Sequence, residues 1–142
     1  MPALPLACLI NVEEECNRDQ ADKYLNGECH LFAIAIARLT NWKIGAITEP
    51  RAVFRDSGIL SLKGLNHAFC YSPDFPDWCF DALGWRRYQD VVEEYPLHPD
   101  CRLEELTQTQ LFEIVYPGEE VCESDLNEVN SFINTFLKHF IF

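Results

Sequence analysis

Cys29 is the residue whose position best suits it for chemistry. It belongs to the segment Asn26-Gly27-Glu28-Cys29-His30, directly before a very apolar run over residues 31–37. A thiol therefore stands where a turn ends and where a helix over residues 28–39 is predicted to begin. The unpaired N–H groups of a first helical turn carry partial positive charge, which favours thiolate over thiol. Because a thiolate is a good nucleophile, this position predicts nucleophilic catalysis.

Two further residues complete a candidate Cys-His-Asp set. His67 and Asp81 lie in short aromatic stretches on either side of a segment rich in turn-forming residues, 72–77, and this pattern predicts a β-hairpin. If the hairpin is symmetric about Asp74, His67 and Asp81 lie directly opposite each other on one face of the sheet. The aspartate then holds one ring nitrogen of the histidine while the other faces the thiol. A slip of one residue would send the two side chains to opposite faces.

This order of residues resembles the papain-like and transglutaminase-like cysteine enzyme superfamily, in which the cysteine begins a helix and the other two residues lie on successive strands. The resemblance covers about residues 26 to 85, and within the superfamily the chain looks like small papain-like toxin or effector domains of bacteria. It implies that Cys29 is the nucleophile, His67 the general base and Asp81 the orienting acid. It also implies a protein or peptide substrate and is compatible with an inhibitor or chaperone partner.

The oxyanion site departs from the papain pattern. That family has a glutamine six residues before the cysteine, where this chain has Lys23. Gln20 and Asn26 are the candidates to replace it, although neither has the family's spacing. His30 and Trp85 are candidates to line a substrate cleft, with core packing as the alternative for the tryptophan.

Composition limits the classes of function. The chain has 142 residues, of which 48% are hydrophobic, and this predicts a single domain over residues 1–142. The net charge of −12 opposes binding to nucleic acid and favours basic proteins or peptides as partners. The apolar segment 1–10 is too short to span a bilayer, so no membrane insertion is predicted. The seven cysteines lack Cys-x-x-Cys spacing, which predicts a reducing cytosol, the cell's own or that of a target cell reached by a secretion system.

Metal binding and purely structural roles are the other interpretations of these residues. His67 and Cys70 have the same spacing as His98 and Cys101, and such pairs can hold zinc. Positions 67 and 70 of one strand point to opposite faces, however, so we predict no metal and no cofactor.

A structural role stays open for Cys29, because free cysteines are often buried. Two roles stay open for Arg86: it binds a substrate carboxylate, or it pairs with nearby acidic residues.

The candidate residues need a helix packed on a sheet to bring them together. The sequence predicts an α+β, papain-like fold in which the cysteine-bearing helix packs on an antiparallel sheet that carries the histidine and the aspartate. Strands are predicted over residues 42–48, 59–62, 66–71, 78–83 and 111–116, with breaks at residues 49–51 and 55–58. Helices are predicted over residues 90–96 and, as a C-terminal amphipathic helix, from an N-cap at Ser124 to Phe140.

The leading functional prediction is a thiol-dependent hydrolase of amide bonds, with cysteine peptidase activity preferred. Glutamine deamidase and transglutaminase are alternatives, because the same triad forms the acyl-enzyme in all three reactions. A catalytically silent, acidic binding or immunity protein is the alternative from a different class.

Overall fold

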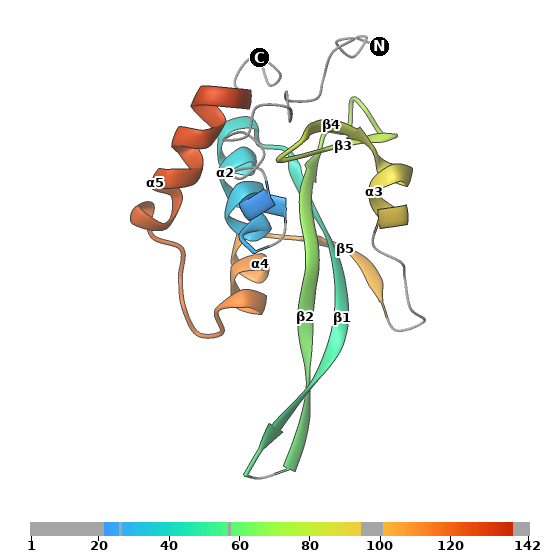
Figure 1. Cartoon of the computed structure of the whole chain (residues 1–142), viewed down its shortest axis with the longest axis vertical. Coiled ribbons are helices and arrows are strands. Elements are labelled where there is room, and N and C mark those ends of the chain that lie inside the picture. Colours follow the sequence, from blue (N-terminus) through green and yellow to red (C-terminus); the bar gives the residue numbers. More distant parts are fainter. Residues whose placement is uncertain (1–21, 26, 57, 95–100, 138–142) are drawn as a thin grey trace.

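The chain folds as an antiparallel sheet with helices on both sides of it. The structure is a computed structural model that describes residues 22–25, 27–56, 58–94 and 101–137. Helices α2, α4 and α5 lie together on one side of the central strand pair and α3 lies on the other side (Figure 1). The predicted α+β class and antiparallel sheet are confirmed. The strands are β1 (Lys43–Arg55), β2 (Gly58–Tyr71), β3 (Trp78–Asp81), β4 (Gly84–Arg87) and β5 (Arg102–Leu106), in the spatial order β4-β3-β2-β1-β5, and the helices are α2 (Cys29–Thr40), α3 (Tyr88–Glu94), α4 (Gln108–Val115) and α5 (Glu123–Phe132), which continues into a π-helical turn, η1 (Ile133–Leu137).

Helix α2 lies at the centre of the main core because it is apolar on nearly all sides. Eight of its twelve residues are buried, and the ring of Phe32 stacks on that of Phe80 in β3 at a centroid distance of 6.2 Å. Burial of each such side chain contributes about 1.5–3 kcal/mol. Asn41, with φ of 61°, ends the helix in the left-handed conformation. The helix predicted from the apolar run is confirmed, and its first residue is Cys29.

Two long strands replace the three shorter ones predicted between residues 42 and 71. Strand β1 runs without a break through residues 49–51 and pairs with β2 along its whole length, so the predicted break at Pro50 is wrong. Proline is tolerated here because β5 pairs with β1 only between Ile44 and Thr48, which leaves Pro50 with no described strand on its other side. The distal part of this hairpin projects beyond the rest of the fold (Figure 1).

Helix α4 occupies the segment for which a strand was predicted, residues 111–116, so that prediction is wrong. The helix begins with a capping box in which the Thr107 hydroxyl accepts from the Gln110 N–H at 3.1 Å and the Gln110 side chain accepts from the Thr107 N–H at 2.9 Å. Leu111 and Phe112 then face the main core and are buried. Local capping and packing on α2 thus outweigh the β-propensity of the sequence.

The C-terminal amphipathic helix packs on the core as predicted. Its N-cap is Cys122, where Ser124 was predicted, because the Asp125 carboxylate accepts the Cys122 N–H at 3.0 Å. The apolar stripe of α5 and η1 is buried against α2, whereas residue 140 lies outside the described part of the chain. The predicted helix over residues 90–96 is found as α3 (Tyr88–Glu94) up to residue 94, and residues 95 and 96 lie outside the described part of the chain. Among the described helices, none has the length and apolarity needed to cross a membrane.

Candidate active site

His67 and Asp81 meet through a register that differs from the predicted one. Cys70 pairs with Phe80, so on this register Asp81 lies opposite Phe69, and His67 is its diagonal neighbour. The predicted direct opposition is therefore wrong by two residues, but an even shift leaves both side chains on the same face. Diagonal neighbours are within reach of a long side chain. The Nε2–H group of His67 donates to Oδ2 of Asp81 at 3.2 Å, and the two side chains are 0% and 1% exposed.

A β-bulge interrupts the β1–β2 pairing at His67. Ile47 pairs with His67, but the next residue of β1, Thr48, pairs with Leu65, so Asn66 is the extra residue. Bulges bend a strand and re-aim the adjacent side chain, and they are common next to active sites. Strict alternation along β2 would direct His67 away from α2, because Ala68 packs in the α2 core. The alternating pattern of residues 66–71 does not predict this bulge.

Cys29 is the first residue of α2, at the end of the helix where backbone N–H groups lack helical partners. The N–H groups of Leu31 and Phe32 donate to the carbonyl oxygen of Glu28 at 3.1 and 3.3 Å, so those of Cys29 and His30 precede the helical ladder. The first turn contains no acidic residue. Glu28, just outside it, pairs with Lys23 at 3.4 Å, which offsets the negative charge beside the thiol. Cys29 itself is 4% exposed.

The His67 imidazole contacts both the thiol and the carboxylate. Burial lowers its pKa, but hydrogen bonds with Asp81 and Cys29, together with the negative charge of each, outweigh burial and raise the pKa of His67 to about 9. Nε2 is engaged with Asp81, so Nδ1 is the nitrogen available to Cys29. With a pKa of about 9, this ring is protonated at neutral pH. The three side chains therefore form a chain of contacts from a thiol through an imidazole to a carboxylate.

The raised pKa of His67 predicts a stability that declines at alkaline pH. Its folded-state pKa of about 9 exceeds the ordinary value of 6.5, so its contribution is complete below pH 6.5 and is lost as the pH rises through about 9. At 1.36 kcal/mol per pKa unit, this contribution is at most about 3 kcal/mol. Urea unfolding of wild type and His67→Gln between about pH 6 and pH 10 measures it. Wild type should lose more free energy of unfolding than the variant over this range; parallel curves would contradict the assignment.

Arg86 joins the site through Asp81: of the two predicted alternatives, pairing with nearby acids is found, but one of the acids is the buried Asp81 and the pair does not lie at the surface. Its Nη1 donates to Oδ2 of Asp81 at 2.9 Å, and its Nη2 pairs with Glu94 at the end of α3. With only 8% of its side chain exposed, Arg86 is occupied by these carboxylates instead of facing a substrate. The signal in the sequence that could have indicated this contact is the tight turn before Gly84. This turn pairs Asp81 with Gly84 and Cys79 with Arg86. Arg86 and Asp81 then lie on one face of the β3–β4 hairpin.

The other predicted site residues do not lie beside the thiol in an open cleft. His30 is 1% exposed and packs against the rings of Phe112 and Tyr116, and burial lowers its pKa. Trp85 is 3% exposed and packs against three aromatic rings of the core: Trp42, Phe75 and Phe80. Both side chains are core residues here, because large rings are most stable when packed.

Gln20 and Asn26 lie outside the described residues, so their oxyanion role stays a prediction.

The residues considered for zinc point in different directions. The Cys70 thiol donates to the carbonyl oxygen of Ala33 in α2 at 3.1 Å, whereas His67 points to Asp81. Cys101 lies 3.6 Å from the Glu49 carboxylate, and residue 98 is outside the described ranges. Within those ranges, no group of three or more histidine, cysteine, aspartate or glutamate side chains could hold a metal ion.

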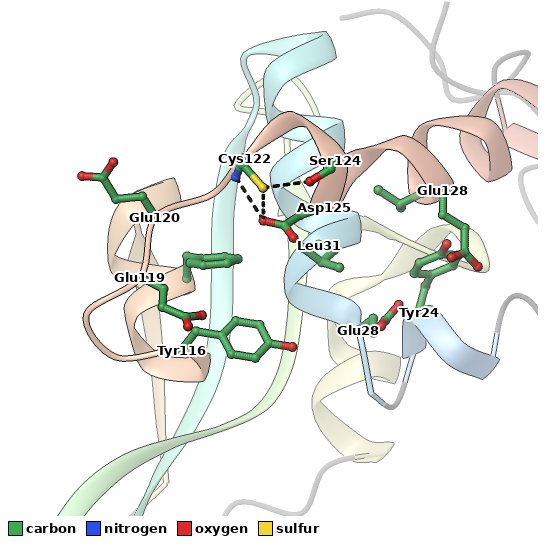
Figure 2. Close-up of a pocket in the computed structure, with 12 residues that line it drawn as sticks. Tyr24, Glu28, Leu31, Tyr116, Glu119, Glu120, Cys122, Ser124, Asp125 and Glu128 are labelled. Atoms are coloured by element: carbon green, nitrogen blue, oxygen red, sulfur yellow. Dashed lines mark hydrogen bonds between the residues drawn. The ribbon is translucent and has the colours of Figure 1, made fainter.

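An acidic cavity of about 640 Å³ opens at the N-terminal end of α2, between that helix and the α4 and α5 segments (Figure 2). Glu28, the residue before Cys29, is part of its wall, so the cavity reaches the end of the helix that carries the thiol. Tyr24 and Tyr116 supply aromatic surface. Its described lining contains no lysine or arginine and includes five carboxylates: Glu28, Glu119, Glu120, Asp125 and Glu128.

The candidate site is thus a connected group of four side chains from four elements. Cys29 comes from α2, His67 from β2, Asp81 from β3 and Arg86 from β4, and each contacts the next. The sheet register and the start of α2 decide this arrangement together. Comparisons of the chain with protein-family models, with curated proteins and with solved structures find no match.

Proposed function

We propose that the chain is a cysteine enzyme of the papain-like or transglutaminase-like type that acts on amide bonds of a protein or peptide substrate. The observation that carries the proposal is the position of His67, which donates through Nε2 to the buried Asp81 carboxylate and contacts the Cys29 thiol. A nucleophile, a base and a group that orients the base are the three parts that such catalysis needs.

The reaction follows from these contacts. The Cys29 thiolate attacks the carbonyl carbon of the substrate and forms a tetrahedral oxyanion. The His67 imidazolium then gives its proton to the leaving nitrogen, which departs as ammonia or an amine and leaves a thioester on Cys29. Water or an amine attacks the thioester, His67 takes the proton of this second nucleophile, and the thiolate leaves. Asp81 keeps the imidazole oriented through both steps.

Backbone N–H groups at the start of α2 are the proposed oxyanion donors. Those of Cys29 and His30 precede the groups that donate to Glu28, and an anion beside a helix N-terminus is stabilised by such groups. Oxyanion stabilisation of this kind contributes about 3 kcal/mol per donor in enzymes. The site therefore does not need the side-chain glutamine of the papain pattern.

The proposed substrate is a basic protein or peptide. The cavity at the N-terminal end of α2 has five carboxylates in its wall, and the whole chain has a net charge of −12. Complementary charge speeds the encounter with a basic partner, most strongly at low salt. Basic proteins and peptides are therefore the first substrates to test.

Intact-mass spectrometry of basic proteins incubated with the enzyme should separate the three possible reactions. A peptidase yields fragments, a deamidase raises the intact mass by about one dalton, and a transglutaminase adds the mass of an amine, because a different group completes each reaction. We expect fragments. Cys29→Ala is the control, and any mass change that survives this substitution would show that Cys29 is not the nucleophile.

A catalytically silent binding protein is the second candidate, favoured by the burial of the triad. Cys29, His67 and Asp81 are 4%, 0% and 1% exposed, so a substrate reaches the sulfur only if covering groups move. Selective alkylation of Cys29 by iodoacetamide below pH 7, ahead of Cys101 and Cys122, supports the enzyme. Peptide mapping that finds Cys29 no more reactive than these two, in a protein that changes no target mass, supports the binding protein.

A further inference from the structure

The Asp81 carboxylate has three hydrogen-bond donors, and two of them share one oxygen. Oδ1 accepts the Leu83 N–H at 2.9 Å. Oδ2 accepts both His67 Nε2–H at 3.2 Å and Arg86 Nη1–H at 2.9 Å. Because the side chain is 1% exposed, these groups take the place of water in stabilising its charge. The guanidinium thus acts on the same atom that orients the proposed base.

Arg86 is itself held between two carboxylates on different elements. Asp81 lies on β3 and Glu94 at the end of α3, and the guanidinium reaches both. Burial works against its charge, but Asp81 and Glu94 outweigh burial and raise the pKa of Arg86. A planar guanidinium presents several donors in a fixed fork, so it can bridge two acceptors in a way that a lysine cannot.

We propose that Arg86 is a positioning residue that fixes the Asp81 carboxylate against His67 and supplies its counter-charge, so that the Cys29–His67 ion pair forms at neutral pH. The inference rests on the proposed function and assigns to that site a fourth, non-catalytic member. Without Arg86, the buried carboxylate either takes up a proton or stays charged with one fewer donor to hold it in place. The first outcome removes the charge that stabilises the imidazolium, and the second lets Oδ2 move away from Nε2 of His67, so both disfavour the thiolate–imidazolium pair.

The surrounding titratable groups do not replace Arg86 in this role. Burial, together with the charge of Asp81, raises the pKa of the Cys79 thiol on β3, so that group stays neutral at the pH of interest. Glu94 on α3 and Glu28 beside Cys29 are carboxylates and bring only negative charge. Lys23 is paired with Glu28 and Glu128. Besides His67 itself, Arg86 is thus the cation that the described contacts place directly on Asp81.

The pH profile of Cys29 alkylation tests the proposal without knowledge of the substrate. Rates for the full-length protein are followed by peptide mapping with iodoacetamide in wild type, Arg86→Met, Arg86→Lys and Arg87→Gln. Arg86→Met should move the profile to higher pH and slow alkylation near pH 6 by about tenfold, the factor that one unit of pH produces. Arg86→Lys should restore part of the rate, because it keeps the charge and loses the bridge. Arg87→Gln, the exposed neighbour that stacks on Trp78, should match wild type.

A double-mutant cycle asks whether Arg86 acts through Asp81. If it does, Arg86→Met should change the profile of wild type but add nothing in an Asp81→Asn background. The double variant removes both buried charges, so it is expected to fold even if Arg86→Met alone does not. In that case Arg86→Lys replaces Arg86→Met as the single variant of the cycle. An unchanged profile in Arg86→Met, full restoration by lysine, or a further shift in the double variant would overturn the positioning role. Wild-type Cys29 that reacts no faster than Cys101 would instead overturn the proposed function.

Discussion

Cys29→Ala and His67→Ala are each expected to lower turnover of an amide substrate by at least about 10³-fold, and the double variant is expected to be no worse than either single one. The reason is that the proposed nucleophile and the proposed base act in the same step, so that once one is removed, removing the other causes no further loss. The structural basis is the contact of His67 with both Cys29 and Asp81. Fragment yield from a basic protein, measured by mass spectrometry, gives the rates.

Two controls separate lost chemistry from lost folding. Cys101→Ala removes a partly exposed thiol outside the site and should retain wild-type turnover. Thermal unfolding of each variant is needed because His67 is fully buried, and truncating it leaves a cavity. Multiplicative losses in the double variant, with both single variants folded, would show that Cys29 and His67 act independently and would contradict the triad.

Asp81→Ala is expected to lower the free energy of unfolding by about 3–5 kcal/mol, because it removes the buried one of the two carboxylates that compensate the Arg86 guanidinium and leaves only the half-exposed Glu94. Both side chains of this pair are almost completely buried, so water cannot replace the lost contact. The His67 ring loses its acceptor in the same variant. Urea unfolding near pH 7 measures the change. This is the largest stability effect that we expect from a single substitution in the candidate site.

Asp81→Ala is compared with two controls: a double variant that lacks both charges of the buried pair, and a variant that breaks an exposed ion pair. Arg86→Met combined with Asp81→Ala should recover part of the loss, because the cation that lost its buried partner is gone. Glu105→Ala, whose side chain is 55% exposed and pairs with Lys43 at 3.2 Å, should cost less than about 1 kcal/mol. A loss of that small size for Asp81→Ala would mean that Asp81 does not compensate Arg86 in the folded protein.

Local sequence patterns predicted the parts of the fold whose neighbours in the chain decide them. The apolar run after Cys29 predicted α2, because a segment apolar on all sides is stable only when buried as a helix. The turn-rich segment 72–77 predicted the connection between the strands that carry His67 and Asp81. The stripe at residues 126, 129, 132 and 133 predicted a C-terminal helix that packs on the core.

Segments with conflicting local signals were predicted wrongly. Residues 111–116 have the composition of a strand, but the capping box at Thr107 and Gln110 and the packing of Leu111 and Phe112 on α2 make them helical. Pro50 has the local signature of a break, but β1 tolerates it because no described strand pairs with this part of β1 on the side opposite β2. The packing on α2 and the extent of the β1–β5 pairing involve residues distant in sequence, so a local pattern could not reveal them, whereas the capping box is a local signal that could have been recognised.

The sequence by itself determined which residues carry the candidate chemistry: a thiol at a helix start, and a histidine and an aspartate on either side of a turn. Only the tertiary structure decided how they meet. The pairing of Cys70 with Phe80 and the bulge at Asn66 set where His67 lies relative to Asp81, and the tight β3–β4 turn brought Arg86 to the same carboxylate oxygen. The reason is that helix starts and turns depend on nearby residues, whereas strand register and buried charge pairs depend on the packing of the whole sheet.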